Sequence, residues 1–438
     1  MYNFLSFLIF VHMKKIAQQI LIYTLVSILF TGCGQAVKNS ETNFRLSPGQ
    51  PEAVGMSEER LAKIDGLIAE YMDKGWIPGA VALVARKGNI VYHKSFGFRD
   101  MEDGDTLRTD DIFRIASMTK AITSTAAMML FEDGKFLLDD PVSKYIPAFR
   151  DPKILVSSMP DGNFTSRKAE GEVTIRQLLT HTSGIGYGFS DPILKEIYAK
   201  VNIPDGFVIT NTTLSAAMDS MGRMPLLFEP GERFHYGLNT DVLGRLIEVV
   251  SGKSLDEFFR ERIFTPLEMD NTHFFLPESK NDRLTVVYAE SETGISPSAD
   301  RSYDYPVAGE KKYLSGGAGL CSTALDYTRF LQLFVNEGKY NGRQLLSPKT
   351  IELIRRNQVG DMFGKNGFGL GFGLLSNEGA AFSLGSVGNM WWGGYFHTHF
   401  WIDPEEDLIG VLLLQMYPVI HDDIAEKFQV LVYQAVTE

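Results

Sequence analysis

Cysteine is scarce in this chain of 438 residues, which contains only Cys33 and Cys321. Two cysteines cannot supply the several disulfides that staple small secreted domains, so a hydrophobic core must hold the fold together. Long basic segments are also missing, and acidic residues outnumber basic ones by 54 to 42, which gives a formal net charge of −12. Because an acidic surface repels phosphate groups, we do not expect nucleic acid to be a partner.

Acidic residues are absent from residues 1–32, which predict a signal peptide. This segment combines the basic MKK at 13–15 with the apolar run ILIYTLVSILF at 20–30, which is too short to span a membrane comfortably. The following LFTGC, which ends at Cys33, resembles a bacterial lipobox, although Phe30 stands where leucine is usual. The resemblance implies cleavage before Cys33 and lipid on its sulfur, and hence an exported protein that is anchored to a bacterial membrane. The alternatives are a plain secretory signal with a chance cysteine and a transmembrane anchor.

A lipid on Cys33 would leave Cys321 without a disulfide partner, so we expect Cys321 to be a buried, small apolar residue.

The domain begins after a polar segment, 33–50, that lacks periodicity and predicts a tether. We expect residues 51–438 to form one domain. Apolar residues at helical spacing predict a helix over 56–75, and two β-rich runs joined at KGN predict a hairpin over 79–97. Residues 136–300 have a mostly helical pattern, interrupted by long loops rich in glycine, proline and asparagine.

After residue 314 the pattern predicts a helix, several strands and a final helix. The strand segments are FGLGFGLL at 368–375, WWGGYFHTHFWID at 391–403 and LIGVLLLQMY at 408–417. Because both ends of the domain supply strands, we expect an α/β protein of the α+β type. Its antiparallel sheet would be flanked by helices, with residues 136–300 inserted. A cleft between the two parts is the natural place for a site.

Ser117 and Lys120 form an S-x-x-K motif inside the apolar segment FRIASMTKAIT at 113–123. On a helix, residues three apart lie on one face with Cβ atoms about 5–6 Å apart. A partly desolvated lysine at that place can lower the pKa of the serine hydroxyl or accept its proton, which activates a nucleophile. The motif also occurs by chance on ordinary solvated helices, so it does not establish chemistry alone.

Further segments turn this motif into a family pattern. They are RQLLTHTSG at 176–184, the segment 230–275 that contains FHYGLN, and the segment 388–415 that contains WWGG. Together with the S-x-x-K motif, and in this order, they resemble the serine β-lactamase and penicillin-binding-protein superfamily over most of residues 54–435. The closest resemblance is to the family VIII carboxylesterases and the class C β-lactamases. It implies that Ser117 is the acylated nucleophile, that Lys120 helps to activate it, and that no cofactor is needed.

Tyr236 matches the tyrosine of the family's second motif. The resemblance implies that it is a catalytic base, which relays protons between the serine, the leaving group and water. Without the other motifs, a buried core tyrosine would explain Tyr236 equally well. The family pattern is Y-x-N or Y-x-S, whereas here the asparagine comes one residue later, at Asn239. Asn239 is the substrate-binding candidate of this motif.

Trp392, Gly393 and Gly394 stand where K-T-G is usual in β-lactamases, and W-G-G at this place resembles the esterases. We predict that these residues bind substrate, because two glycines let a strand backbone approach a ligand closely. The resemblance implies an oxyanion hole made by the backbone amides of Ser117 and Tyr395. The missing lysine removes a cation that would hold a substrate carboxylate, which disfavours β-lactams and D-Ala peptides.

The HTH sequence at 397–399 places two histidines two positions apart. No acidic or cysteine cluster of metal-ligand type accompanies them, so we predict no metal site. If side chains alternate along one strand, His397 lies in the cleft and is a substrate-binding candidate. His397 or Arg233 could then supply the missing positive charge. The G-x-S-x-G of α/β-hydrolases is absent.

These observations predict an exported, lipid-anchored serine hydrolase that acts through an acyl-enzyme on small-molecule esters, with amides as the other substrate class. A carboxylesterase is the first interpretation. A D-aminopeptidase, a DD-peptidase or a weak β-lactamase is the alternative within the class. A catalytically silent binding protein on the same fold is the alternative from another class. The presence of Ser117, Lys120 and Tyr236 together argues against a silent protein.

Overall fold

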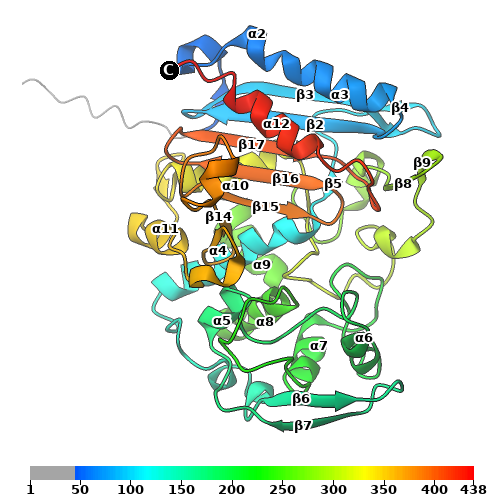
Figure 1. Cartoon of the computed structure of the whole chain (residues 1–438), viewed down its shortest axis with the longest axis vertical. Helices are drawn as coiled ribbons and strands as arrows, with labels where there is room; N and C mark the ends of the chain where they lie inside the picture. Colours follow the sequence, from blue (N-terminus) through cyan, green and yellow to red (C-terminus); the bar gives the residue numbers. More distant parts are fainter. Residues whose placement is uncertain (1–44) are drawn as a thin grey trace, which may run out of the picture. The chain divides into compact units, whose positions relative to one another are not determined.

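A nine-stranded sheet organises the computed structural model, which describes residues 45–438 (Figure 1). The strand order is β1-β3-β2-β17-β16-β15-β14-β13, and β4 pairs with β3. All neighbours are antiparallel except β1 and β3. The strands are β1 (Ser47–Pro48), β2 (Gly79–Arg86), β3 (Asn89–Asp100), β4 (Asp105–Thr106), β13 (Gly367–Phe368), β14 (Gly373–Leu374), β15 (Met390–Gly394), β16 (Thr398–Asp403) and β17 (Leu408–Leu413). The predicted fold class is confirmed.

The predicted hairpin over 79–97 is present as β2 and β3. Every residue of β2 is buried, so both faces of the sheet are covered at its centre. On one face Val81, Leu83 and Ala85 join the larger core, while Ala80 and Val84 join the core on the other face.

Helices from the two ends of the domain cover one face of the sheet. They are α2 (Glu58–Leu61), α3 (Lys63–Asp73) and α12 (Ile424–Tyr433) (Figure 1). The single helix predicted over 56–75 is therefore two helices. Ser57 caps the first of them, because its side chain accepts a hydrogen bond from the amide of Arg60.

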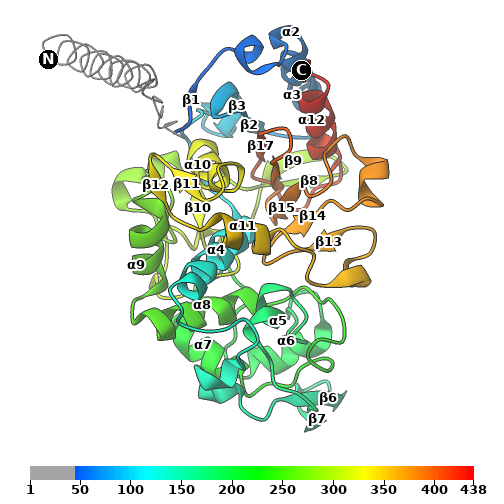
Figure 2. The same ribbon diagram turned by 90° about the vertical axis from the view of Figure 1, so that its left-hand side faces the viewer.

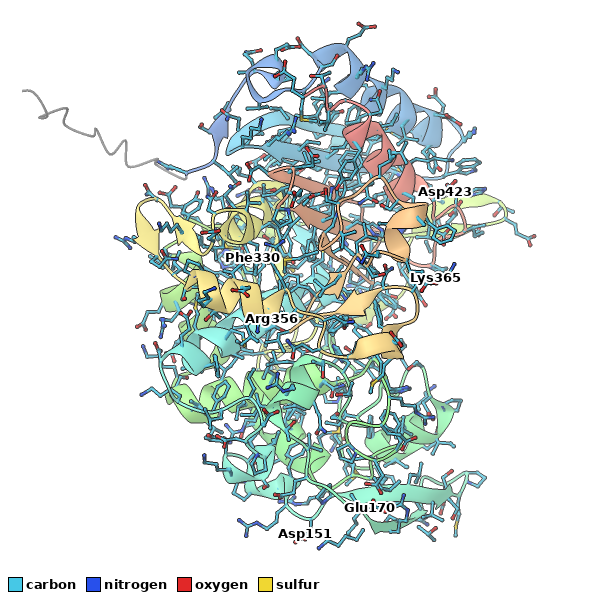
Figure 3. All side chains as sticks on the ribbon, turned by 60° about the vertical axis from the view of Figure 1, so that its left-hand side comes forward. Asp151, Glu170, Phe330, Arg356, Lys365 and Asp423 are labelled. Carbon is cyan, nitrogen blue, oxygen red and sulfur yellow. The ribbon has the colours of Figure 1, made fainter. Side chains whose placement is uncertain are left out.

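The other face packs against α4 (Thr119–Glu132) and α10 (Ala324–Val335). Figure 2 shows α4 between the sheet and the inserted region. Phe330 of α10, which is labelled in Figure 3, is fully buried in this core. Short elements complete the layer: β5 (Phe113–Arg114) pairs with β10 (Cys321–Ser322), β11 (Lys339–Tyr340) pairs with β12 (Arg343–Gln344), and α11 (Pro348–Ile354) follows. Cys321 is buried as predicted, and burial raises the pKa of its thiol to about 11.

The inserted region, 136–300, is less helical than predicted. Its helices are α5 (Ile175–Leu179), α6 (Pro192–Ala199), α7 (Leu214–Met221), α8 (Asn239–Ser251) and α9 (Leu255–Phe259). Two hairpins accompany them, β6 (Lys153–Ser158) with β7 (Phe164–Lys168), and β8 (Tyr288–Ser291) with β9 (Gly294–Pro297). The helix α8 packs against α4 and so connects this region to the segment that carries Ser117.

Three boundaries differ from the sequence predictions. The segment 391–403 is two strands, because Tyr395, Phe396 and His397 form the turn between β15 and β16. The segment 368–375 is likewise divided into β13 and β14 by a turn in which Gly371 has a φ of 91°. The predicted tether ends before residue 50, since β1 already belongs to the sheet. The predicted signal peptide and Cys33 lie outside the described residues.

Within residues 45–438, no helix combines the length and the apolar character needed to cross a bilayer.

Candidate active site

Ser117 lies in a short 3-10 helix, η2 (Ala116–Met118), immediately before α4. The preceding residue, Ala116, has a φ of 41°, a left-handed conformation that a residue with a Cβ rarely adopts. Strain of this kind persists only where the surrounding structure fixes it, and it often marks a functional turn. Here it occurs at the residue directly before Ser117.

Lys120 follows one turn later and is almost fully buried, with 2% of its surface exposed. Its Nζ atom donates a hydrogen bond to Oγ of Ser117 at 3.2 Å. It also donates to the hydroxyl of Tyr187 and to the carbonyl of Gly317, both at 2.8 Å. Three oxygen acceptors thus replace the water shell of a buried ammonium and hold it beside the serine.

Tyr187 is a site residue that the sequence analysis missed. It follows α5 in the sequence GIGYGF, close to the RQLLTHTSG segment. Burial is the largest cause, and Tyr236 and Asp241 are further causes, of a Tyr187 pKa well above its ordinary value. Tyr187 therefore remains a neutral phenol whose oxygen accepts the hydrogen bond from Lys120. A lone aromatic residue between two glycines, just after a family motif, was the signal that could have found it.

Tyr236 lines the same cavity as Ser117. The indole Nε1 of Trp392 donates a hydrogen bond of 3.2 Å to its hydroxyl. The Nζ atom of Lys120 lies 4.6 Å from the centre of its ring, which is a cation–π distance. Lys120 therefore contacts Tyr236 through the ring, whereas it donates a hydrogen bond to the hydroxyl of Tyr187.

Asn239 is buried and does not line the cavity, which contradicts its prediction as a substrate-binding residue. It is fully buried as the first residue of α8. Its Oδ1 accepts a hydrogen bond from Ser183, and its Nδ2 lies 3.1 Å from Nδ1 of His181 and 3.3 Å from the carbonyl oxygen of Ile185. Because the asparagine comes one residue later than in the family pattern, its side chain points into the protein interior and away from the cavity.

The contact of Asn239 with His181 supports the site indirectly. The ring of His181 packs against the ring of Tyr236, with 4.7 Å between the ring centres. Burial, with a smaller effect of Lys120, lowers the pKa of His181 well below its ordinary value. His181 is therefore neutral, and its Nδ1 is free to accept a hydrogen bond from Asn239.

The end of β15 lies against the segment that carries Ser117. A Cβ atom on Gly394 would come within 2.4 Å of the carbonyl oxygen of Ile115, so only glycine permits this approach. Trp392, Gly393, Gly394 and Tyr395 all line the cavity, and substrate binding by the W-G-G segment stays a prediction.

His397 does not line the cavity, so its prediction as a substrate-binding residue is wrong. It lies in the turn after β15, with a φ of 62°, and is largely buried. The alternation argument failed because it applies only within a strand, and β16 begins at Thr398. His399, which is in β16, lines the cavity instead.

The cavity has a volume of about 580 Å³, which is in the range of small-molecule sites. Aromatic side chains form much of the wall near Ser117: Tyr187, Phe189, Phe207, Tyr236, Trp392 and Tyr395. Among the described residues that line it, the charged ones are Asp205 and Glu426. Arg233 lies over the ring of Phe228 and does not contribute a charge to this wall.

Within residues 45–438, no group of three or more histidine, cysteine, aspartate or glutamate side chains could hold a metal ion.

The sequence matches a family model described as Beta-lactamase over residues 64–434. Esterase EstB from Burkholderia gladioli is 32% identical over 385 residues, which are 83% of this chain and 92% of EstB. Lovastatin esterase from Penicillium rubens is 29% identical over 401 residues, which are 84% of this chain and 96% of that relative.

A solved structure gives the same picture. EstCE1, described as a hydrolase with promiscuous acyltransferase activity, matches with a TM-score of 0.75 at 28% sequence identity. The match covers 86% of this chain and 99% of EstCE1.

Proposed function

The chain belongs to the beta-lactamase family of serine hydrolases, and we propose that within it the chain is a carboxylesterase that forms an acyl-enzyme on Ser117. The family match confirms the predicted superfamily. The observation that carries the proposal is the composition of the cavity wall. It joins Ser117 to aromatic side chains and, among the described residues, presents acidic groups but no cationic side chain.

Acylation starts when Oγ of Ser117 attacks the ester carbonyl carbon. Tyr236 acts in its phenolate form: its oxygen accepts the proton of Ser117 and then passes that proton to the departing alkoxide, which leaves as the alcohol and returns Tyr236 to the phenolate. The N–H of Trp392 and the ammonium of Lys120 lie where they stabilise the negative charge of this phenolate before it accepts the proton. Water then attacks the carbonyl carbon of the acyl-enzyme. Tyr236 takes a proton from this water and passes it to Oγ of Ser117, which leaves as the carboxylic acid is released.

The carbonyl oxygen of the substrate gains negative charge in this step. We infer that the backbone amides of Ser117 and Tyr395 donate hydrogen bonds to it. The close approach of Gly394 to Ile115 supports this inference, because it brings the end of β15 against the turn that precedes Ser117.

Esters suit this wall better than β-lactams or D-Ala peptides do. The latter two carry a carboxylate, whereas the wall offers Asp205 and Glu426, which repel anions. Lys120 does not bind such a carboxylate, because it is 2% exposed and already donates hydrogen bonds to three oxygen atoms of the protein. Trp392 stands where a lysine would neutralise the carboxylate.

We also infer that the protein is exported and is held at a bacterial membrane by lipid on Cys33. The LFTGC sequence after an apolar run supports this inference.

The function is tested by comparing three substrates with the purified protein: a short p-nitrophenyl ester, a chromogenic cephalosporin and a D-Ala-D-Ala peptide. We expect the ester to give the highest kcat/KM, and we expect a fluorophosphonate probe to label Ser117. Efficient turnover of the cephalosporin or the peptide with poor use of esters would replace the carboxylesterase with the alternative hydrolases. No labelling and no turnover would indicate a silent protein.

A further inference from the structure

The cavity extends beyond the surroundings of Ser117 onto the sheet face that α12 covers. Side chains on this face include Trp391 of β15 and Trp401 of β16, which are directly paired, and His399, which is paired with Gly393. Trp401 packs on Phe428 of α12 with 5.3 Å between ring centres. We call the part of the cavity that is lined by Trp391, Asn389, His399, Trp401 and Gln429 the α12 lobe.

The α12 lobe is reached around the free edge of β15. Within the described chain, β14 pairs with Met390 and Trp391 and does not continue along β15 to Trp392. Gly393 has no side chain, and a Cβ atom there would come within 3.3 Å of Nδ1 of His399. Because Gly393 lacks this Cβ atom, the imidazole of His399 can line the cavity.

Polar atoms without partners gather in this lobe. Within residues 45–438, Nε1 of Trp401, Oδ1 of Asn389 and Nε2 of His399 are buried and lack a hydrogen-bond partner. The side chains of Trp401 and Asn389 are only 4% and 2% exposed, and both line the cavity. Unsatisfied buried polar groups weaken a fold, so a ligand that forms hydrogen bonds with these three atoms would gain affinity from them.

A hydrogen bond with Tyr433 of α12 fixes the orientation of the Asn389 side-chain amide. Its Nδ2 donates a hydrogen bond of 2.9 Å to the hydroxyl of Tyr433, which itself donates to Asp403 at 2.7 Å. The other end of the amide, Oδ1, therefore remains as an acceptor. The lobe thus offers a donor on Trp401, an acceptor on Asn389 and, on His399, a group that can be either.

We propose that the α12 lobe is a second substrate subsite, which binds the far end of the ester as an uncharged, largely apolar chain that carries a hydroxyl or carbonyl oxygen. This inference rests on the proposed esterase function. The indoles of Trp391 and Trp401 provide the apolar surface, and the N–H of Trp401 donates to the oxygen of the ligand. An anionic end group is excluded because Glu426 is the charged side chain that borders this lobe.

The charge state of His399 agrees with an uncharged ligand. Burial, together with the neighbouring His397, lowers the pKa of His399 to about 3. The imidazole is therefore neutral at physiological pH and offers no positive charge to a carboxylate or a phosphate.

Distance decides which esters can reach the lobe. Trp391 precedes Gly394, the last residue of β15, by three strand positions, which is about 10 Å at 3.3 Å per residue. An acetyl or butyryl group near Ser117 ends short of that distance, whereas a medium or long chain covers it. Figure 3 labels Asp423, which directly precedes α12, and Lys365, which is the neighbour of the cavity-lining residue Asn366.

The test blocks the lobe from α12. Gln429→Trp fills the lobe with an indole, and Val430→Trp is the matched control, because Val430 is the next residue, is 50% exposed and does not line the cavity. Trp401→Phe keeps an aromatic ring but removes the N–H. Each variant is assayed with p-nitrophenyl acetate, p-nitrophenyl decanoate and p-nitrophenyl ω-hydroxydecanoate, and with ω-hydroxydecyl acetate to place the chain on the alcohol side.

We expect Gln429→Trp to lower kcat/KM for the ω-hydroxylated chain by about 10-fold or more, and to keep the acetate within about 2-fold, while Val430→Trp changes neither. Trp401→Phe should lower the preference for the ω-hydroxydecanoate over the decanoate by about 3- to 10-fold, as for one lost hydrogen bond. If Gln429→Trp impairs only p-nitrophenyl ω-hydroxydecanoate, the acyl chain enters the lobe. If it impairs only ω-hydroxydecyl acetate, the alcohol chain does.

Normal use of both ω-hydroxylated esters by Gln429→Trp, with intact acetate hydrolysis, would overturn the subsite and leave the esterase function standing. If the wild-type protein hydrolyses none of the esters, the esterase function fails, and the subsite inference fails with it.

Discussion

The side-chain nitrogen of Lys120 lies 2.8 Å from the hydroxyl oxygen of Tyr187, although 67 positions separate the two residues. A buried ammonium needs acceptors on several sides, and Tyr187 provides one of them from the inserted region. The hydrogen bond thereby connects the inserted region to α4, the helix that carries Lys120 and follows Ser117. We interpret Tyr187 as a positioning residue for Lys120 and Tyr236 as the proton carrier.

The first prediction separates these two tyrosines. Tyr187→Phe removes one acceptor of a buried cation, which costs about 1.5–3 kcal/mol, so we expect kcat/KM for a short ester to fall about 10- to 100-fold. Tyr236→Phe removes the proton carrier, and we expect a loss of about 10³-fold or more. The pH dependence of kcat should change for Tyr236→Phe and keep its shape for Tyr187→Phe. An equal loss in both variants, with the pH profile altered only by Tyr187→Phe, would exchange the two roles.

The second prediction concerns the nucleophile. Ser117→Ala should abolish labelling by a fluorophosphonate and lower turnover by about 10⁴- to 10⁶-fold, as other deletions of a nucleophile do. The free energy of unfolding should change little, because only one hydroxyl group is lost. Mass spectrometry of the labelled wild-type protein and urea unfolding of the variant are the measurements. Retained turnover would mean that the S-x-x-K motif lies on an ordinary helix.

The sheet and most of the helices could be predicted because their apolar residues follow simple periods. The two β-rich runs that become β2 and β3 and the helical spacing before them are visible without any structure. The positions of Ser117, Lys120, Tyr236 and the W-G-G segment came from the family motifs rather than from periodicity.

The errors have physical causes at particular residues. Asn239 comes one residue late, and one residue on a helix rotates a side chain by about 100°, so it faces the protein interior. The turn before β16 contains neither glycine nor proline, so its aromatic and histidine residues were taken as strand, which misplaced His397. Tyr187 lies in a loop, where no period marks the residues that a distant helix will contact.

A third prediction uses the buried histidines. Burial lowers the pKa of His397 to about 4, whereas an exposed histidine has a pKa of 6.5. Between these two values the unfolded chain binds a proton that the folded chain does not, so the free energy of unfolding falls as the pH falls through this range. For His397 the loss between pH 7 and pH 5 is about 2 kcal/mol.

His397→Asn tests this loss, because asparagine tolerates the positive φ of this position. Urea unfolding at pH 7 and pH 5 should show that the variant loses about 2 kcal/mol less than the wild-type protein does. His181 and His399 have lowered pKa values as well, so part of the pH dependence should remain. Identical losses in the two proteins would contradict the role of His397.

A fourth prediction concerns the proposed anchor at Cys33. The mature wild-type protein should partition into the detergent phase of a phase-separation assay, and Cys33→Ala should block processing or release the protein. Cys321→Ala is the matched control, since that thiol is buried in the fold and should not affect partitioning. A wild-type protein found wholly in the aqueous phase would rule out lipid on Cys33.

The last prediction concerns substrate choice at Trp392. In the wild-type protein this indole packs near Tyr236, and among the described residues that line the cavity none is a cation. A missing charge-assisted contact costs about 1.5–3 kcal/mol, which is about 10- to 100-fold in specificity against a substrate with a carboxylate. Trp392→Lys should restore that contact and raise the ratio of cephalosporin to ester kcat/KM by about this factor.

Trp392→Phe is the control for Trp392→Lys, because both substitutions remove the indole N–H that donates to Tyr236. Each should therefore slow ester hydrolysis, but only the lysine adds a positive charge. The informative quantity is the ratio of the two kcat/KM values, since damage to the shared catalytic step cancels in it. A ratio that rises equally in both variants would show that the indole acts by its bulk, and an unchanged ratio in Trp392→Lys would mean that the carboxylate binds elsewhere.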